Sequence, residues 1–499
     1  MNPGAGRLYT FAVAVALFAM ESRDIYKNLS PLDHRYWLSN PTVFESLSDI
    51  VSEHASVRFC ARVEAELCVA LLEHEGVQDS DVYASVRHAA ESIDPSEVAS
   101  EEVKTQHNIR ALVNVLKRHV PAEAAPYIHL GATSVDILDT AASLRLREAV
   151  LTVLVPETVR VVELLCALSE THAETPQVGR THGQFAVPIT FGFAMSEYAS
   201  RLSKSVVRMG DLVGDLRGKI AGAVGAYNAT TMITPDAVGL ERKVLDRLGL
   251  KPSDHSTQLV EPEHSLRVLL EINIAFGILA NLADDMRNLQ RSEISEAREA
   301  FTETQVGSST MPHKRNPWNW EHVKSLWKAY APRVMTFYMD QISEHQRDLT
   351  NSASSRFVTE YLAGYTAAVH RTARVLARIE PDIEHMARNL TAAGDMCMAE
   401  PAYILLALAG ESDAHEQVRV ATLEAGKTGG KLLDALRAQP RTWQAIDAEC
   451  MKRLGHDADA LFASPEQYRG QAVEQARTNS RASRDRLKTI TDITDRRQT

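Results

Sequence analysis

The feature that most constrains the fold of this chain is a long helical pattern of apolar residues near its middle. Over residues 263–303 the apolar positions recur at steps of three and four, as they do on one face of a helix. Further patterns of this kind cover residues 191–202, 319–343 and 357–379. Helices longer than the usual globular helix need neighbours to pack against, so the sequence predicts a bundle of long helices.

Strand patterns of alternating β-branched residues between tight turns are almost absent. The predicted fold class is therefore all-α, with an elongated central bundle of long helices flanked by smaller N- and C-terminal helical domains. The expected divisions are an N-terminal extension over residues 1–20, a helical domain over 21–124, the bundle over 125–379 and a C-terminal domain over 380–499. Polar breaks at residues 79–81 and 94–96 mark shorter helices in the N-terminal domain.

Charge and cysteine content narrow the class of protein. The net charge of −11 over 499 residues argues against a general nucleic-acid surface, although it leaves room for a local basic pocket. The five cysteines are odd in number, scattered and without a CxxC pair, which suggests neither a zinc site nor a disulfide framework. This pattern is typical of a reducing compartment, so we expect a cytoplasmic protein.

The first residues allow two interpretations. Leu8 to Met20 is mostly apolar and follows Arg7, as in the apolar region of a signal peptide, and it is too short to span a membrane. Alternatively, translation starts at Met20, which is the interpretation we favour because the rest of the sequence has cytosolic character. No other segment is expected to span a membrane.

The loop over residues 307–317 (GSSTMPHKRNP) carries the densest set of reactive side chains. A glycine opens it and two prolines interrupt it, so it cannot continue a helix. Its serines, lysine and asparagine can donate hydrogen bonds to an anion and provide an oxygen base. For an arbitrary chain, a polar surface connection would be the simpler interpretation.

Three further polar segments interrupt helical patterns: residues 129–136 (HLGATSVD), 179–184 (GRTHGQ) and 345–352 (HQRDLTNS). Each has an ordinary explanation taken alone. Thr133 and Ser134 could be helix N-caps, and His182 could be a structural histidine. Arg347 and Asp348 could form a solvated charge pair.

Together these segments resemble a known family. The loop resembles the GSSxMPxKxNP signature of the fumarase/aspartase superfamily, and RTHGQ and QRDLTNS are similar to the segments of the adenylosuccinate lyases within it. Other similar segments are residues 30–36 (SPLDHRY), 219–225 (KIAGAVG), 256–258 (STQ), 398–401 (MAEP) and 414–416 (AHE). The resemblance covers nearly the whole chain from about Met20.

The resemblance implies roles for individual residues. His182 matches the general acid and Ser308 the general base, while Lys314, Asn316, Thr133 and Ser134 match contacts to the succinyl carboxylates. Asn108 stands where the family has aspartate, which keeps a hydrogen-bond acceptor and loses the charge. The remaining positions that match substrate-binding residues are Arg35, Tyr36, Gln106, His107, Gln258, Arg347, Ser352 and Arg356.

The implied reaction eliminates fumarate from adenylosuccinate to give AMP, and from the corresponding succinylated ribonucleotide of purine synthesis (SAICAR, giving AICAR). It needs fixed donors at the carboxylate that spreads the carbanion charge, and a histidine to protonate the leaving nitrogen. No cofactor or metal is expected. The broad apolar helix faces and the resemblance both predict a homotetramer with active sites shared between subunits.

Several alternatives stay open on the sequence. 3-Carboxy-cis,cis-muconate cycloisomerase has a very similar loop but belongs to another reaction class, and argininosuccinate lyase and fumarase fit the other segments less well. A helical scaffold without catalysis is a different class of hypothesis. The presence of both His182 and Ser308 argues against such a scaffold.

Overall fold

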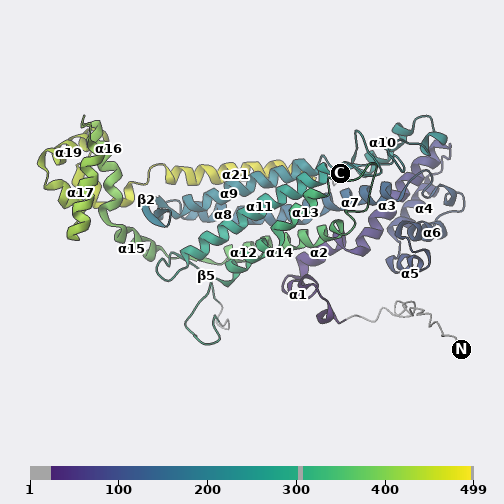
Figure 1. Cartoon of the computed structure of the whole chain (residues 1–499), viewed down its shortest axis with the longest axis horizontal. Helices are drawn as coiled ribbons and strands as arrows, with labels where there is room; N and C mark the ends of the chain where they lie inside the picture. The colour runs from purple at the N-terminus through teal and green to yellow at the C-terminus, as the bar shows by residue number, and fades with distance from the viewer. Residues whose placement is uncertain (1–23, 302–306, 496–499) are drawn as a thin grey trace, which may run out of the picture. The chain divides into compact units, whose positions relative to one another are not determined.

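The computed structural model describes residues 24–301 and 307–495, and within these ranges the chain is almost entirely helical (Figure 1). The all-α prediction is confirmed. The predicted N-terminal extension, residues 1–20, lies outside the described residues. Contacts divide the chain into two compact units. The first comprises the chain up to Pro156 with Arg208–Ile274 and Lys328–Ala367, and the second comprises Glu157–Val207, Ala275–Trp327 and Ala368–Thr499. The three sequence regions stay a prediction about domains.

Helices of 5 to 22 residues form the N-terminal part of the first unit, and two of them begin at the predicted polar breaks. The Asp79 and Asp94 side chains cap the helices that follow them by accepting backbone N–H groups. The helices of this part are α1 Arg35–Ser39, α2 Pro41–Val51, α3 Glu53–His74, α4 Ser80–Glu91, α5 Pro95–Thr105, α6 Asn108–His119 and α7 Ser134–Ala149.

The helices in the middle of the chain, several of them long, begin after a π-helical turn at Val150–Leu154. They are α8 Val155–Thr171, α9 Phe191–Val213, α10 Ala237–Leu248, α11 Glu263–Leu289, α12 Trp318–Tyr330, α13 Val334–Met339 and α14 Val358–Leu376. The pattern at 191–202 lies within α9, and α14 occupies most of the pattern at 357–379, whose two ends lie in a 3-10 turn and in a strand. The C-terminal helices are α15 Ile383–Ala393, α16 Ala399–Leu408, α17 Ala414–Thr428, α18 Leu432–Arg437, α19 Pro440–Leu454, α20 Ala458–Ala463 and α21 Ala472–Asp495.

Two predicted helices are shorter than their patterns. The helix expected over 263–303 ends at Leu289. The chain then passes through turns over residues 290–294 and the left-handed Ser295 (φ +53°) into strand β5, Ala297–Glu299. The helix expected over 319–343 ends at Tyr330. There Pro332 lies in a 3-10 turn, Ala331–Arg333, and proline has no N–H to continue the ladder.

The strands are few and pair in twos. β1, Pro176–Thr181, and β2, Gln184–Thr190, form an antiparallel hairpin, while β5 pairs antiparallel with β6, Ile379–Pro381. β3, Arg217–Gly218, pairs parallel with β4, Lys251–Pro252. The sequence analysis missed the β1–β2 hairpin, which carries the GRTHGQ segment.

One helix of the described chain, α11, is long and apolar enough to cross a membrane by length and composition. Of its most apolar window, 61% is buried within the fold, which is typical of a core helix. Helix α3 supplies much of the core of the first unit, since Leu67, Leu71 and Leu72 are all fully buried. Each such side chain stabilises the fold by about 1.5–3 kcal/mol relative to exposure.

Candidate active site

His182 lies at the tip of the β1–β2 hairpin in the second unit. Thr181 pairs with Gln184, so His182 and Gly183 form a two-residue turn, and both have positive φ (+54° and +74°). These are the features of a type I′ turn, which matches the twist of the flanking strands. The His182 side chain is exposed. A histidine in this strained backbone region is unusual, and such strain gathers at functional sites.

A buried carboxylate anchors the base of this hairpin. Glu296 is fully buried and accepts hydrogen bonds from Gln177 Nε2 (2.7 Å), Arg180 Nη2 (2.6 Å) and Asn389 Nδ2 (2.8 Å). The Arg180 guanidinium also lies 5.4 Å from the centre of the Phe185 ring. Arg180 of the RTHGQ segment therefore holds the hairpin in place, two residues before His182.

The loop that carries Ser308 folds back on itself. The backbone at Gly307 packs so closely on the Lys314 carbonyl that an added Cβ would come within 2.2 Å of that oxygen. The Asn316 side-chain amide donates to the Gly307 carbonyl (3.1 Å), and the Met311 N–H donates to Ser308 Oγ (3.1 Å). Lys314 is exposed. Asn316 thus stabilises the loop in this conformation.

The loop leads into α12 through a second buried carboxylate. Glu299 accepts hydrogen bonds from the Trp320 N–H (3.0 Å) and Asn319 Nδ2 (2.7 Å), and so caps the start of the helix. Burial raises the pKa of Glu299 above its ordinary value. The Arg371 guanidinium lies over the Trp318 ring, and Trp320 is fully buried. The two tryptophans therefore support the base of the loop.

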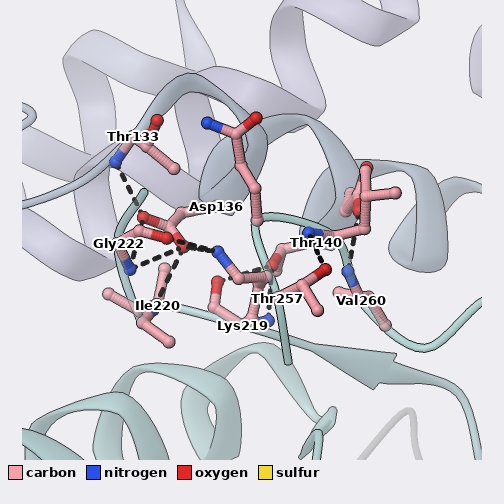
Figure 2. Close-up of polar contacts among 12 residues, drawn as sticks. Thr133, Asp136, Thr140, Lys219, Ile220, Gly222, Thr257 and Val260 are labelled. Carbon is pink, nitrogen blue, oxygen red and sulfur yellow. Dashed lines mark hydrogen bonds and ion pairs between the residues drawn. The ribbon is translucent and has the colours of Figure 1, made fainter. Parts of the chain in front are cut away.

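In the first unit, a buried ion pair joins the HLGATSVD and KIAGAVG segments (Figure 2). The Lys219 ammonium donates to Asp136, and both side chains are fully buried. Asp136 also accepts the N–H groups of Thr133 (2.7 Å), Ala221 (3.1 Å) and Gly222 (3.2 Å). Since Thr133 is the N-cap of α7, one carboxylate fixes both polar segments.

The STQ and HQRDLTNS segments also meet in the first unit. Gln258 Oε1 accepts a hydrogen bond from Arg347 Nη1 (3.2 Å), and the Gln258 N–H donates to the Gln346 carbonyl (3.3 Å). On the other side, a Cβ added at Gly225 would lie 2.0 Å from the Ser256 carbonyl oxygen. The KIAGAVG segment therefore packs directly against the STQ segment.

His107 reaches the same group of segments. It is the N-cap of α6, and its Nδ1 accepts the Arg110 N–H, while its Nε2 lies 3.4 Å from Ser134 Oγ. Gln106 ends α5 in a left-handed conformation and donates to the Val103 carbonyl (2.8 Å). The Asn108 side-chain oxygen accepts a hydrogen bond from the Ile109 N–H. Asn108 therefore makes a local backbone contact at the position where the family has a charged aspartate.

The remaining predicted residues are placed apart from these contacts. Arg35 and Tyr36 begin α1, while Ser352 and Arg356 are exposed beside and within the 3-10 turn Ser354–Phe357. Across residues 24–301 and 307–495, no hydrogen bond or ion pair joins the His182 turn to Ser308, Lys314 or Asn316. Side-chain contacts between predicted site residues are thus seen within the first unit, in the His107–Ser134 and Gln258–Arg347 pairs.

Sequence reasoning missed the buried charges beneath these segments: Asp136, Lys219, Glu296 and Glu299. A usable signal was present for Lys219, since a lone lysine opens an otherwise apolar, glycine-rich run. Buried charges are rare unless they are paired, so such a lysine indicates a buried partner. No comparable signal marks Glu296 or Glu299, which lie in a polar stretch of sequence.

Comparison with known proteins supports a common origin. Residues 43–335 match the family model described as Lyase, and residues 343–454 match the model of the adenylosuccinate lyase C-terminal region. An adenylosuccinate lyase of Pyrococcus abyssi is 33% identical over 89% of this chain and 95% of its own length. An N-acetyl-S-(2-succino)cysteine lyase of Dickeya dadantii is 28% identical over 82% and 90% of the two chains.

A solved structure gives the same fold. The 3-carboxy-cis,cis-muconate lactonizing enzyme from Pseudomonas putida has a TM-score of 0.73 and 23% identity, and the match covers 90% of this chain and 98% of that one. At this identity the likeness extends to the fold alone.

Proposed function

The chain belongs to the lyase family that matches residues 43–335, and from this membership we propose that it is an adenylosuccinate lyase. It is a carbon–nitrogen lyase that eliminates fumarate from adenylosuccinate to give AMP, and from SAICAR to give AICAR. The structural observation that carries the proposal is the convergence of segments far apart in sequence, where His107 contacts Ser134 and Arg347 contacts Gln258.

In the proposed mechanism the base removes a proton from the carbon beside one succinyl carboxylate, and the C–N bond then breaks to release fumarate. His182 gives a proton to the leaving nitrogen, a role in proton transfer that histidine side chains often fill in enzymes. Ser308 takes the carbon-bound proton. Lys314 and Thr133 hold the succinyl carboxylates, and their fixed donors stabilise the charge that develops there.

The loop geometry offers a reason why a serine can act as a base. A serine hydroxyl is a weak base unless its alkoxide is stabilised. In this loop the N–H groups of Thr310 (3.4 Å) and Met311 (3.1 Å) both donate to Ser308 Oγ. Backbone donors aimed at an oxygen favour its charged form. Lys314, six residues later in the same loop, adds a positive charge that would also favour the Ser308 alkoxide.

We also infer that the enzyme is a cytoplasmic homotetramer with shared active sites. The argument rests on the family and on the exposed tip that carries His182. Mixing His182→Ala and Ser308→Ala subunits tests it, because hybrid tetramers would contain some sites with both residues intact. Activity returning only in the mixture supports shared sites. Hybrids that form, as seen by mass spectrometry, but stay inactive contradict them.

The experiment that tests the function follows absorbance while purified protein is offered adenylosuccinate. The same protein is then offered argininosuccinate, 3-carboxy-cis,cis-muconate and N-acetyl-S-(2-succino)cysteine. We expect turnover of adenylosuccinate and release of AMP and fumarate in equal amounts. Preference for any of the other three compounds would overturn the proposal.

A further inference from the structure

Asp139 is a carboxylate that no role described so far accounts for. It lies one turn after Asp136 on α7, and its Oδ2 accepts the N–H of Val260 (3.0 Å), two residues beyond Gln258. The side chain lines a cavity of about 230 Å³ within the first unit. Asp139 therefore touches the backbone of the segment that presents Gln258.

The turn between Val260 and Gln258 is short and internally bonded. The Thr257 N–H donates to the Leu259 carbonyl (3.1 Å), and the Leu259 N–H donates to Thr257 Oγ1 (3.2 Å). A hydrogen bond to the Val260 N–H thus fixes the end of a compact turn. Gln258 projects from this turn to Arg347.

The charges around Asp139 come from several elements. Lys219 and Arg347 favour its ionised form, whereas Asp136 disfavours it. Arg145 donates hydrogen bonds to the Ile50 and Val51 carbonyls. Arg217 donates hydrogen bonds to the Pro252 carbonyl and to the Asp215 carboxylate. The charged or titratable side chains that line the same cavity are Arg145, Arg217, Glu261, His264 and Asp340.

Keeping a carboxylate here lowers stability at neutral pH. Burial raises the pKa of Asp139 from 3.8 to about 6, despite the Val260 hydrogen bond and the two cations. Because the folded-state pKa is the higher one, the folded protein binds more protons than the unfolded chain between these values. The stabilising contribution of the protonated form is fully present below pH 3.8 and is lost as the pH rises through about 6.

We propose that Asp139 is a positioning residue for anionic substrate: it holds the Val260 amide, fixes the turn that carries Gln258, and through Gln258 sets the Arg347 guanidinium. The inference rests on the proposed function, in which Arg347 binds substrate. A residue with a purely structural role gains nothing from a charge that opposes folding, whereas an ionised acceptor makes a stronger hydrogen bond than a neutral one.

The test compares Asp139→Asn and Asp139→Ala with Asp236→Asn. Asp236 is a matched control, because its carboxylate also accepts one backbone N–H, that of Gly239 (2.9 Å), and it caps α10 in the same unit. Steady-state kinetics with adenylosuccinate and calorimetric binding of AMP are measured at pH 7.5, together with Tm from pH 5 to 8.

We expect KM and the AMP Kd to rise about threefold in Asp139→Asn and tenfold or more in Asp139→Ala, with kcat within about twofold of wild type. The Tm of Asp139→Asn should exceed that of wild type at pH 8, and the gain should shrink toward pH 5. Asp236→Asn should leave KM unchanged, since asparagine caps a helix about as well as aspartate.

Unchanged KM and AMP Kd in Asp139→Ala would overturn the proposal. A lower kcat and a higher KM, changed by similar factors, together with a lower Tm in Asp139→Asn would also overturn it, because that pattern indicates a structural role. Failure of the proposed function is seen separately, as a wild type that binds AMP without cleaving adenylosuccinate. In that case the AMP Kd of the variants still decides the positioning role.

Discussion

The surroundings of Asp136 and those of His182 are built in opposite ways. Four groups donate hydrogen bonds to the fully buried Asp136 carboxylate: the Lys219 ammonium and three backbone N–H groups. His182 instead lies exposed on a two-residue turn with a strained backbone. The first arrangement fixes positions through a satisfied buried network. The second leaves the His182 side chain exposed at the tip of its hairpin.

This contrast matches the proposed roles, in which one region binds the substrate and the other transfers protons. In the first unit, predicted substrate-binding residues contact each other in two pairs, Ser134 with His107 and Gln258 with Arg347. In the second unit the proposed proton-transfer residues His182 and Ser308 lie on a turn and a loop, whose bases contact the buried Glu296 and Glu299. Substitutions in the first region should therefore affect mainly stability and substrate binding, and those in the second mainly turnover.

The largest expected effect is on turnover. Ser308→Ala and His182→Asn should each lower kcat by about a hundred- to ten-thousand-fold, because each removes a positioned proton-transfer group. Asparagine tolerates the left-handed backbone at residue 182, so the hairpin should persist. Stopped assays with adenylosuccinate measure the loss.

Ser309→Ala is the matched control for the loop, and we expect its kcat within a few-fold of wild type. Near-normal turnover in Ser308→Ala would place the base elsewhere, and His107 and Ser309 would be the next residues to test.

The next effect is on stability. Lys219→Met should lower the free energy of unfolding by about 3–5 kcal/mol, because it leaves the Asp136 charge buried without its partner. Lys251→Met removes a lysine from an exposed pair with Asp215 (3.2 Å), and it should cost less than about 1 kcal/mol. Urea unfolding followed by circular dichroism compares the two variants. Equal losses in the free energy of unfolding would mean that the buried Lys219–Asp136 pair contributes no more to stability than an exposed pair does.

Two glycine substitutions should have a smaller effect on stability, and comparing them should distinguish the cost of close packing from that of backbone strain. Gly225 and Gly76 both have positive φ (+75° and +81°), but only Gly225 approaches another chain segment, at Ser256. Gly76→Ala should cost about 1–2 kcal/mol, the strain of a left-handed residue alone. Gly225→Ala should cost more and should also raise KM, because the STQ segment must move. A KM equal to that of Gly76→Ala would contradict the packing argument.

Helical periodicity predicted the all-α fold because long apolar stripes have few alternative structures. It failed where local backbone geometry decides the outcome. The His182–Gly183 turn closes a hairpin that a short, weakly alternating sequence does not reveal, and α11 ends at Leu289 without a proline or glycine between that residue and β5. The buried carboxylates were missed because a sequence does not say which side of a segment faces the interior.

The site residues are predicted from the resemblance, and the structure adds the contacts that some of these residues make. Asp136 accepts the Thr133 N–H, His107 lies within hydrogen-bond distance of Ser134, and Arg347 donates to Gln258. Arg35, Ser352 and Arg356 are exposed, and their predicted roles depend on the bound substrate. Composition and spacing alone could not have separated these two groups.

The most direct test of the division between binding and chemistry is calorimetric titration of AMP into Arg347→Ala, Ser308→Ala and wild type. We predict that Ser308→Ala binds AMP within about twofold of wild type, because its loss concerns proton transfer. Arg347→Ala should bind AMP about ten- to a hundredfold more weakly, since a charged donor to anionic oxygens is lost. Weakened AMP binding in Ser308→Ala together with unchanged binding in Arg347→Ala would contradict the account.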